Sequence, residues 1–366
     1  MNRSRYIYNC ILAGILTASV ALSGCGSASY VNGTEGQGAA QSADAGEALP
    51  EGSTGQLPGS DGGAKSTETP SADTASDTQA TAPQTADQSA ASGGQGTRDN
   101  TPVVLVPTQP GTVVYGNDLV SIDASNAGDG YISVTYFGTS PKVKMQITCP
   151  NTVTYTYNLT GGCEVFPLTT DSGTYSIGVF EVISGTEYST CFRTDIEATV
   201  TNEFGAYLYP NQYVNFSPDD ACVAKAAELA YSANTDLDVV TNVYNYMIQN
   251  VTYDTQLANT VESGYLPDPD RTLSSCTGIC LDYACLMASM LRSQGIPTHM
   301  EVGYASTAYH AWISIYLKET GWVNGIIEFN GTSWELMDPT FAASASAAEL
   351  QEFIGDGSNY DTKYIY

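Results

Sequence analysis

The sequence predicts a multidomain chain, with an N-terminal all-β sandwich followed by an α+β domain. Residues 101–205 hold short Val, Ile, Thr and Tyr runs that alternate apolar and polar positions, a pattern typical of strands. From residue 206 the apolar positions recur at helical spacing, and strand-like runs return after residue 297. This order of elements favours two successive folded domains rather than one mixed sheet.

The first 25 residues have the pattern of a lipoprotein signal peptide. Arg3 and Arg5 precede an apolar stretch, Ile11–Leu22, whose 12 residues are too few to cross a bilayer as a helix. The stretch ends in Leu22-Ser-Gly-Cys25, which resembles the bacterial lipobox, where the cysteine is diacylated. We therefore expect an extracytoplasmic protein anchored to the membrane by a lipid on Cys25. The alternative is an ordinary secretory signal with an incidental cysteine.

Residues 26–100 are rich in Gly, Ser, Ala, Thr, Asp and Gln. Such a segment buries too little apolar surface to offset its ordering entropy, so a disordered tether is expected. As a flexible coil it would span roughly 45–50 Å.

The charge of the chain argues against nucleic-acid binding. The formal charge is −27, with +2 in residues 1–25 and −8 in residues 26–100, which leaves −21 for residues 101–366. Phosphate backbones would repel so acidic a surface. The acidity favours solubility and, more weakly, basic substrates.

The region 101–205 predicts an antiparallel, immunoglobulin-like sandwich, because six strand-like runs are separated by Gly- and Pro-containing turns. The runs are Val113–Tyr115, Tyr131–Tyr136, Val143–Ile147, Val153–Leu159, Thr174–Val182 and Tyr188–Val200. Asp123, Asn126 and Asp129 lack the spacing of a calcium loop, and turn chemistry explains them better.

The region 206–366 predicts helices and then strands. One helix is expected to begin at Ser217-Pro-Asp-Asp220 and a second near Thr235, with a turn-rich loop over 253–272. A third, Ile279–Gln294, is apolar nearly all round and should be buried. The strands expected after it are His299–Tyr304, Ala311–Tyr316, Ile326–Phe329 and Trp334–Met337.

Three residues of this region suit cysteine acyl transfer. Cys280 lies in the first turn of the third helix, where free N–H groups and the helix dipole favour a thiolate. His310 directly precedes one expected strand, and Asp338 directly follows another. A thiolate attacks, an imidazole activates it and protonates the leaving amine, and a carboxylate orients the imidazole. Trp312, two residues beyond His310, would lie on the same strand face and exclude water.

Five ordered blocks resemble the transglutaminase-like superfamily, whose fold is related to that of papain. They are Gly278-Ile-Cys-Leu-Asp-Tyr-Ala284, Leu291-Arg-Ser-Gln-Gly-Ile-Pro297, Val302-Gly-Tyr304, His310-Ala-Trp312 and Trp334-Glu-Leu-Met-Asp-Pro-Thr340. The likeness covers roughly residues 206–345. It implies Cys280 as nucleophile, His310 as base and Asp338 as the orienting carboxylate. The flanking segments are similar to the extracellular bacterial branch, which often places this domain behind a β-sandwich.

The remaining polar candidates have weaker assignments. We expect the oxyanion to be held by the Cys280 N–H and one side chain of the 253–277 loop, with Tyr265 and Thr277 as candidates. Asp282 is expected to be a polar position on the helix, and His299 a solvated surface residue.

The cysteines allow several arrangements. Seven remain after the signal and Cys25, so at least one has no partner within the domains. Cys280 itself has a structural alternative, as a buried or disulfide-bonded residue. Cys276, four residues before it, is atypical for the family and could pair with Cys222 or lock Cys280 by oxidation. Cys285 points elsewhere on the helix and should be a core residue. No cofactor is expected, and two histidines without paired CxxC motifs argue against a metal site.

The leading hypothesis is a membrane-anchored cysteine protease or amidase that acts on a peptide or protein substrate through a thioester. A cross-linking transglutaminase would use the same residues with an amine as acceptor. The rival from another class is a non-catalytic adhesion or cell-wall-binding lipoprotein. A folding or pilus-assembly partner that presents sandwich edges is a further alternative.

Overall fold

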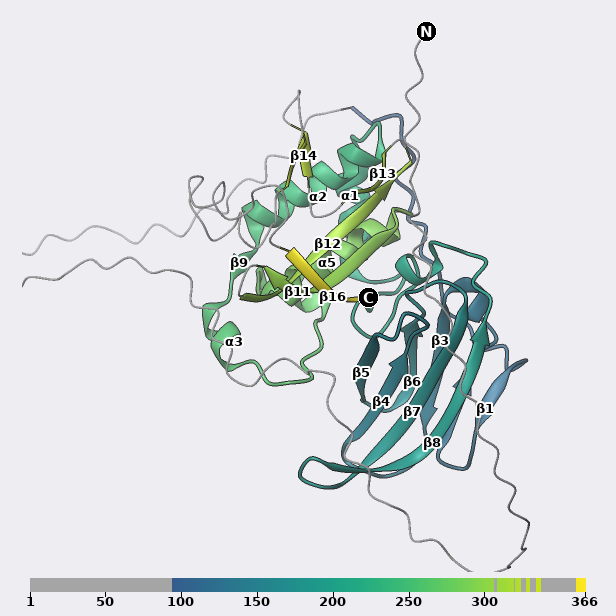
Figure 1. Ribbon diagram of the computed structural model, residues 1–366. Coiled ribbons are helices and arrows are strands. Elements are labelled where there is room, and N and C mark those ends of the chain that lie inside the picture. The colour runs from purple at the N-terminus through teal and green to yellow at the C-terminus, as the bar shows by residue number, and fades with distance from the viewer. Residues whose placement is uncertain (1–93, 306–307, 319, 324–326, 330–333, 337–359) are drawn as a thin grey trace, which may run out of the picture. The chain divides into compact units, whose positions relative to one another are not determined.

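The computed structural model describes residues 94–305, 308–318, 320–323, 327–329, 334–336 and 360–366 (Figure 1). All of these described residues belong to one compact unit. Strands make up its first part, and helices and a second group of strands make up the rest.

The first part contains two four-stranded antiparallel sheets (Figure 1). One has the order β1-β2-β3-β6, with β1 Val114–Gly116, β2 Val120–Asp123, β3 Tyr131–Tyr136 and β6 Gly162–Pro167. The other has the order β5-β4-β7-β8, with β5 Thr154–Leu159, β4 Val143–Thr148, β7 Gly173–Ser184 and β8 Glu187–Ala198. All six expected strands are present, while β2 and β6 are additional.

Alternating side chains of both sheets enter one hydrophobic core. In β4, Val143, Met145 and Ile147 are buried while the residues between them are partly exposed. Ile132 and Phe166 of the other sheet join the same core. Burying each such side chain contributes about 1.5–3 kcal/mol, so the period-2 pattern fixes which face of each strand is covered.

The described residues contain two short 3-10 turns, at Ala127–Asp129 and Gly205–Tyr207, and then five α-helices. They are α1 Ala221–Ala230, α2 Asp236–Asn250, α3 Thr255–Thr260, α4 Pro269–Ser275 and α5 Cys280–Ser293. Thr235 caps α2 as expected, in a capping box with Asp238. The expected start of α1 at Ser217 is wrong, because Asp220 is the N-cap. The expected loop over 253–272 instead contains α3 and the start of α4.

The third helix of the sequence analysis is α5, and its burial is confirmed, since every residue from Leu281 to Ser293 is buried. It packs against β11 Thr298–Ala305 and β12 Ala308–Leu317. These strands belong to an antiparallel sheet of order β13-β12-β11-β16, with β13 Gly321–Val323 and β16 Tyr360–Ile365. A hairpin joins β14 Ile327–Phe329 to β15 Trp334–Leu336. The mixed helix and strand content expected here is confirmed.

Specific contacts connect the two parts. The Gln212 side chain donates to the main-chain oxygen of Asn158 in β5, at 2.7 Å. The Tyr155 hydroxyl accepts from the Ile365 N–H at 3.2 Å, and its ring packs edge-on against Tyr364. The edge strand β5 therefore contacts the segment that follows β8 and the end of β16. Within the described segments, no helix is long and apolar enough to span a membrane.

Candidate functional site

Cys280 is the first residue of α5 and is partly exposed. The preceding residue, Ile279, is extended and follows the short strand segment β10 Thr277–Gly278, which pairs in parallel with β9 Thr252–Tyr253. The thiol therefore lies at the positive end of the helix dipole, beside main-chain N–H groups that the helix leaves free. This arrangement favours an anion at the position of the sulfur.

Asp282 holds the main chain that directly precedes Cys280. Its Oδ2 accepts the Ile279 N–H at 2.9 Å, as a helix-capping carboxylate does. A Cβ at Gly278 would lie 2.6 Å from the Asp282 Cβ, so only glycine lets the chain pass this carboxylate. The position expected to be simply polar is thus a buried structural anchor next to the nucleophile.

A tyrosine and an arginine complete the bonding of Asp282. Its Oδ1 accepts the Tyr265 hydroxyl at 2.7 Å and lies 3.1 Å from Arg271 Nη2, which also contacts the Tyr265 hydroxyl. Burial and then the bond to Asp282 raise the pKa of Tyr265 well above its usual value. The hydroxyl proton that an oxyanion would need is already donated to Asp282. The sequence signal for this cluster is the acidic residue two positions after Cys280.

His310 lies in β12, opposite Gly303 of β11, and is buried. Trp312 is two residues further along the strand and is also buried. The two ring centroids lie 6.2 Å apart with their planes 24° from parallel. Because α5 packs on β12, the helix that begins with Cys280 rests on the strand that carries His310.

The other predicted site residues divide into two groups. Thr277 lies in β10, and its main-chain oxygen accepts a hydrogen bond from Ser275 at 3.2 Å. Asp338 and Cys25 lie outside the described residues, so their roles stay predictions.

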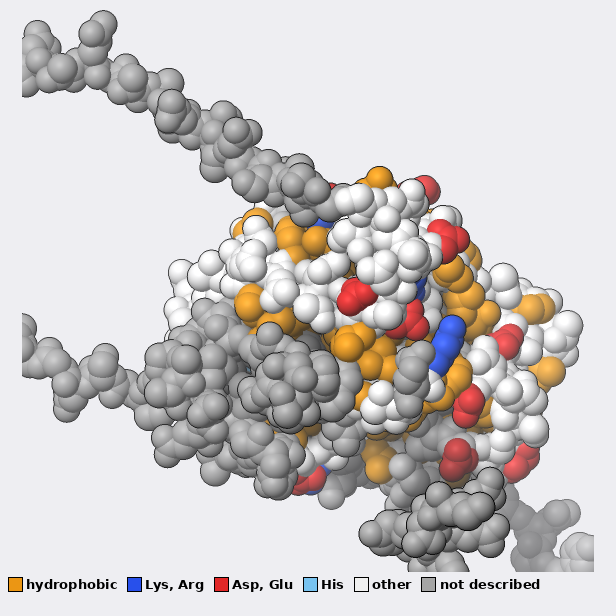
Figure 2. All heavy atoms as spheres, turned by 90° about the horizontal axis from the view of Figure 1, so that it is seen from above, with side chains coloured by type: hydrophobic (Ala, Val, Ile, Leu, Met, Phe, Trp, Pro, Cys, Tyr) orange, Lys and Arg blue, Asp and Glu red, His pale blue; other side chains and the backbone are white. Residues whose placement is uncertain are grey.

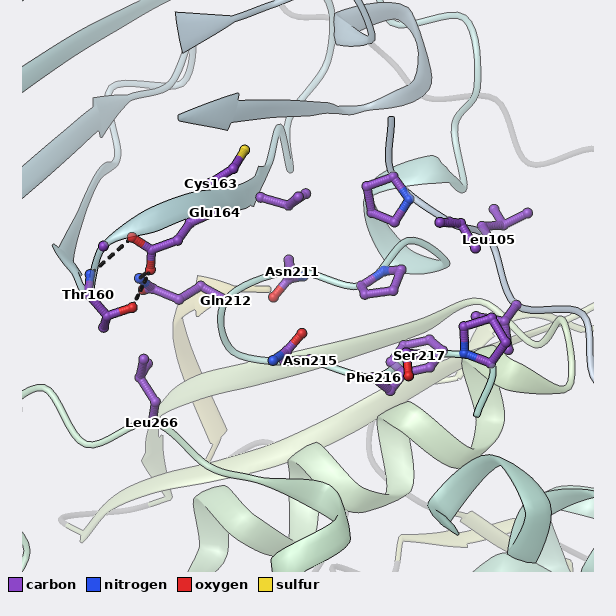
Figure 3. A pocket seen from close by; sticks show the side chains of 17 residues that line it. Leu105, Thr160, Cys163, Glu164, Asn211, Gln212, Asn215, Phe216, Ser217 and Leu266 are labelled. Carbon is purple, nitrogen blue, oxygen red and sulfur yellow. Dashed lines mark hydrogen bonds between the residues drawn. The ribbon is translucent and has the colours of Figure 1, made fainter. Parts of the chain in front are cut away.

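Two cavities are candidates for the substrate site. A cavity of about 110 Å³ is lined by Leu281 and Tyr309, the sequence neighbours of Cys280 and His310. A larger one of about 390 Å³ is lined by none of the predicted site residues. Figure 3 shows the larger cavity, in which Glu164 accepts hydrogen bonds from Thr160 and Gln212. We assign the smaller cavity to the candidate site, because its lining includes the residues next in sequence to Cys280 and His310, although not Cys280 or His310 themselves.

The seven cysteines of the described residues are free. Cys285 is fully buried in the core, as expected, and burial raises its pKa to about 12. Cys276 is exposed and lies in the left-handed region at φ 54°. The pairings considered for Cys276, with Cys222 or with Cys280, are not formed. Among the residues that the structure describes, no group of three or more His, Cys, Asp and Glu could hold a metal.

His299 is not the solvated surface residue that the alternation predicts. Its ring stacks on Trp322 at 3.6 Å and tilts against Tyr207 at 4.0 Å. Its Nδ1 lies 3.7 Å from Glu301 Oε1. Burial lowers the pKa of His299, and this effect outweighs the opposing influence of Glu301. The strand pattern correctly sets His299 apart from Met300, but distant aromatic residues cover that face.

Comparison with known proteins identifies the domain. Residues 223–325 match the family model of the transglutaminase-like superfamily, a range that includes Cys280 and His310. No curated protein sequence matches the chain.

Three solved structures with low similarity were also found. A candidate cysteine protease from Cytophaga hutchinsonii is 15% identical, with a TM-score of 0.31, and the match covers 62% of this chain and 79% of that one. A TGase is 17% identical, with a TM-score of 0.27 and 48% of each chain covered. The red sea bream transglutaminase is 12% identical, with a TM-score of 0.23, covering 57% of this chain and 48% of that one. The chain spans about half the length of the last two proteins. The family match and the layout of α5 on its sheet together identify a transglutaminase-like domain in this chain, at residues 223–325.

Proposed function

We propose that the chain is a cysteine acyl-transfer enzyme that acts on peptide or amide bonds, with hydrolysis as its main outcome. The observation that carries the proposal is Cys280 at the N-terminus of a buried helix that packs on the strand of His310. Transglutaminase-like domains place a nucleophilic cysteine and its base on such elements. Asp338 is proposed as the carboxylate that orients His310.

The chemistry follows from these groups. His310 takes the proton of Cys280, and the thiolate attacks the substrate carbonyl. The tetrahedral oxyanion is stabilised by the Cys280 N–H and a second donor, for which Thr277 is a candidate. The amine leaves with the proton from His310, and a thioester remains. Water then releases an acid, or an amine releases a new amide.

The location and the N-terminal part belong to the same proposal. The signal at residues 1–25 would leave a lipid on Cys25, and residues 26–100 would tether the folded part to the membrane surface. Residues 101–205 would form an immunoglobulin-like sandwich in front of a catalytic domain at 206–366. The two antiparallel sheets and their common core support the sandwich assignment.

The test is the pH dependence of Cys280 alkylation by iodoacetamide, measured by mass spectrometry on the full, reduced chain. We expect rapid reaction at pH 6, where a free cysteine with a pKa of about 8.5 is almost fully protonated. His310→Ala should abolish this reactivity and Asp338→Asn should reduce it. The chain has only two histidines, so His299→Gln is a matched control that should leave it intact.

Slow alkylation that is indifferent to His310→Ala would contradict the proposal and favour the non-catalytic binding protein. The acceptor is tested separately, by incubating the enzyme and casein with a fluorescent primary amine. Release of free acid without amine incorporation is expected. Accumulation of the amine conjugate would instead assign the chain as a cross-linking transglutaminase.

A further inference from the structure

The small cavity lined by Leu281, the residue after Cys280, is formed by elements that are far apart in the sequence. Strands β4 and β5 contribute one wall, and the 263–265 segment, the start of α5 and the neighbourhood of β16 contribute the others. The lining residues are Lys142, Lys144, Thr156, Asn158, Tyr213, Ser263, Gly264, Tyr265, Leu281, Val302, Tyr309, Tyr364 and Tyr366. A substrate that extends from Cys280 past Leu281 into this cavity would therefore meet side chains of the strand-rich part.

The charge of this lining is opposite to that of the chain. The sequence has 39 Asp and Glu against 12 Lys and Arg, yet the cavity lining includes two lysines and no Asp or Glu. The cavity of 390 Å³, by contrast, includes Glu164. Figure 2 shows one face of the molecule, where acidic side chains recur and basic ones are sparse. A pair of lysines with no Asp or Glu in the same lining is thus a local exception.

These lysines are also among the few cations left unneutralised. The described residues include nine Lys and Arg side chains. Four of them form ion pairs, namely Arg98, Lys225, Arg271 and Lys363. Arg292 is buried and donates to main-chain oxygens. Within the part of the chain that the structure describes, Lys142 and Lys144 have no ion pair and are available to a ligand.

Strand pairing between β4 and β5 and the close contact at Gly264 fix the cavity wall that carries Lys144. Lys144 pairs in register with Asn158, so the two side chains lie next to each other on one face of β4 and β5. Its Nζ lies 5.0 Å from the centre of the Tyr188 ring, which helps to hold the ammonium group. A Cβ at Gly264 would lie 2.3 Å from Asn158 Nδ2, so the 263–265 segment closes against Asn158 only as glycine. Asn158 Oδ1 is buried without a hydrogen-bond partner among the described atoms and can accept a ligand N–H.

We propose that Lys142 and Lys144 recognise a carboxylate of the substrate, so that the candidate acyl-transfer site selects acidic peptides. The lysines bind a glutamate or aspartate side chain near the bond that Cys280 attacks, and Asn158 accepts an N–H of the same peptide. This inference rests on the proposed function, since it assigns the substrate class of that site. It reverses the preference for basic substrates that the net charge alone suggests.

The test uses two alkylating probes of similar size and different charge, iodoacetate and iodoacetamide. In both reactions the thiolate attacks the methylene carbon and iodide leaves, so the ratio of their rates at one cysteine reports the local potential. The full, reduced chain is labelled at low ionic strength, and each cysteine is followed by mass spectrometry. Cys163 and Cys276 are exposed and serve as internal references, with free cysteine as the external one.

We expect the iodoacetate-to-iodoacetamide ratio at Cys280 to exceed those at Cys163 and Cys276. Lys142→Gln/Lys144→Gln should lower this ratio about three- to tenfold, and any change in the thiolate fraction of Cys280 cancels because both reagents react through the thiolate. Lys318 is exposed and does not line the cavity, so Lys318→Gln is a control for the loss of a lysine charge and should have no effect. In the unaltered chain, 1 M salt should bring the ratio down toward that of free cysteine.

A ratio at Cys280 that is no higher than at Cys163, or that the double substitution leaves unchanged, would overturn the inference. A comparison of two peptides needs no variant, so it tests the inference even if the double variant fails to fold. Failure of the proposed function has a different signature, namely slow iodoacetamide alkylation that does not depend on His310. As a test with a peptide, acetyl-tetraglutamate amide should protect Cys280 from iodoacetamide better than the tetraglutamine analogue. Equal protection would also contradict the selection of acidic peptides.

Discussion

The carboxylate of Asp282 accepts the main-chain N–H of Ile279 at 2.9 Å, which ties the residue before Cys280 to the first turn of α5. The same carboxylate receives the Tyr265 hydroxyl and contacts Arg271. Asp282 is 1% exposed, so these partners replace the water that it loses. The direction in which the Cys280 sulfur points therefore depends on a carboxylate that takes no part in the proposed chemistry.

Replacing Asp282 with alanine should impair both stability and thiol reactivity. The change removes a helix cap and leaves the Ile279 N–H and the Tyr265 hydroxyl without an acceptor, for a loss of about 2–4 kcal/mol in unfolding free energy. Arg271 is half exposed, so its ion pair adds little to that figure. Urea unfolding measures the first effect and iodoacetamide alkylation of Cys280 the second.

Asp238→Ala is the matched control for this prediction. Asp238 accepts the Thr235 N–H at 3.0 Å and so caps α2 in the same way. Its loss should destabilise the protein without changing the alkylation rate of folded Cys280. If Asp282→Ala and Asp238→Ala affect that rate equally, Asp282 is only a structural cap and does not position the thiol.

Cys285 should be unreactive in the folded protein although it lies in the same helix as Cys280. It is fully buried five residues after Cys280, and burial raises its pKa to about 12. We expect no alkylation of Cys285 at pH 8 in the folded protein and full alkylation in 8 M urea. Peptide mass spectrometry of the two labelled samples reads both sites at once. Alkylation of Cys285 in the folded protein as fast as that of exposed Cys163 would show that α5 opens readily.

The elements with the clearest periodicity can be predicted from the sequence. The strand Tyr131–Tyr136 has the limits that its alternation indicates, and α5 begins and ends within one residue of the expected helix. The strand β6 is not predictable from local sequence, because it begins with Gly162 and ends with Pro167, residues that disfavour strands. Its pairing with β3 along six residues outweighs that local preference.

Two Pro-containing segments show why the predicted and observed helix starts differ. Pro269 follows the cap Asp268 and opens α4, although the segment has the composition of a turn. Pro218 is expected to open α1, which instead begins at Ala221. The Asp270 carboxylate accepts the N–H groups of Ala221 and Cys222, at 2.9 and 2.8 Å. A cap from a residue 48 positions away is a tertiary contact that no local pattern reveals.

The positions of single site residues on a helix or strand can be predicted from local sequence, but the surroundings that distant segments provide cannot. Cys280 at a helix start and His310 on a strand both follow from local sequence. The burial of His299 depends on Trp322 and Tyr207, which are distant in the sequence. The lysines of the small cavity likewise lie far from Cys280 in the sequence. Lys144 is in β4 and Lys142 directly precedes this strand, more than 130 residues before Cys280.

His299 should make folding stability depend on pH in the mildly acidic range. Burial lowers its folded pKa below the value of about 6.5 that it has in the unfolded chain. Between these two values the unfolded chain binds more protons, so stability must fall as the pH drops. Burial alone would raise the pKa of Glu301, but bonds from His299, Ser314 and Thr362 lower it, so its contribution is lost only at more acidic pH. When the unfolding free energy is measured with urea between pH 7.5 and 5, it should depend less steeply on pH in His299→Gln than in the unaltered chain. An unchanged slope would show that other groups cause the pH dependence.

Arg292 should be the most costly single charge to remove. It is fully buried in α5 and donates to the main-chain oxygens of Tyr209, Thr298 and Tyr366 at 2.7–3.0 Å. Arg292→Met fills a similar volume but removes these buried hydrogen bonds to main-chain oxygens, for an expected loss of about 3–5 kcal/mol.

Arg193→Met is the matched control, because Arg193 is exposed in β8 and its replacement should change stability by less than about 0.5 kcal/mol. Urea unfolding of both variants measures the difference. Because Thr298 begins β11 and Arg292 lies in α5, the loss of Arg292 should also loosen the packing of the helix on its sheet. The Cys280 alkylation rate should then fall together with stability. A stable Arg292→Met variant with a reactive Cys280 would show that water can replace the guanidinium at these oxygens.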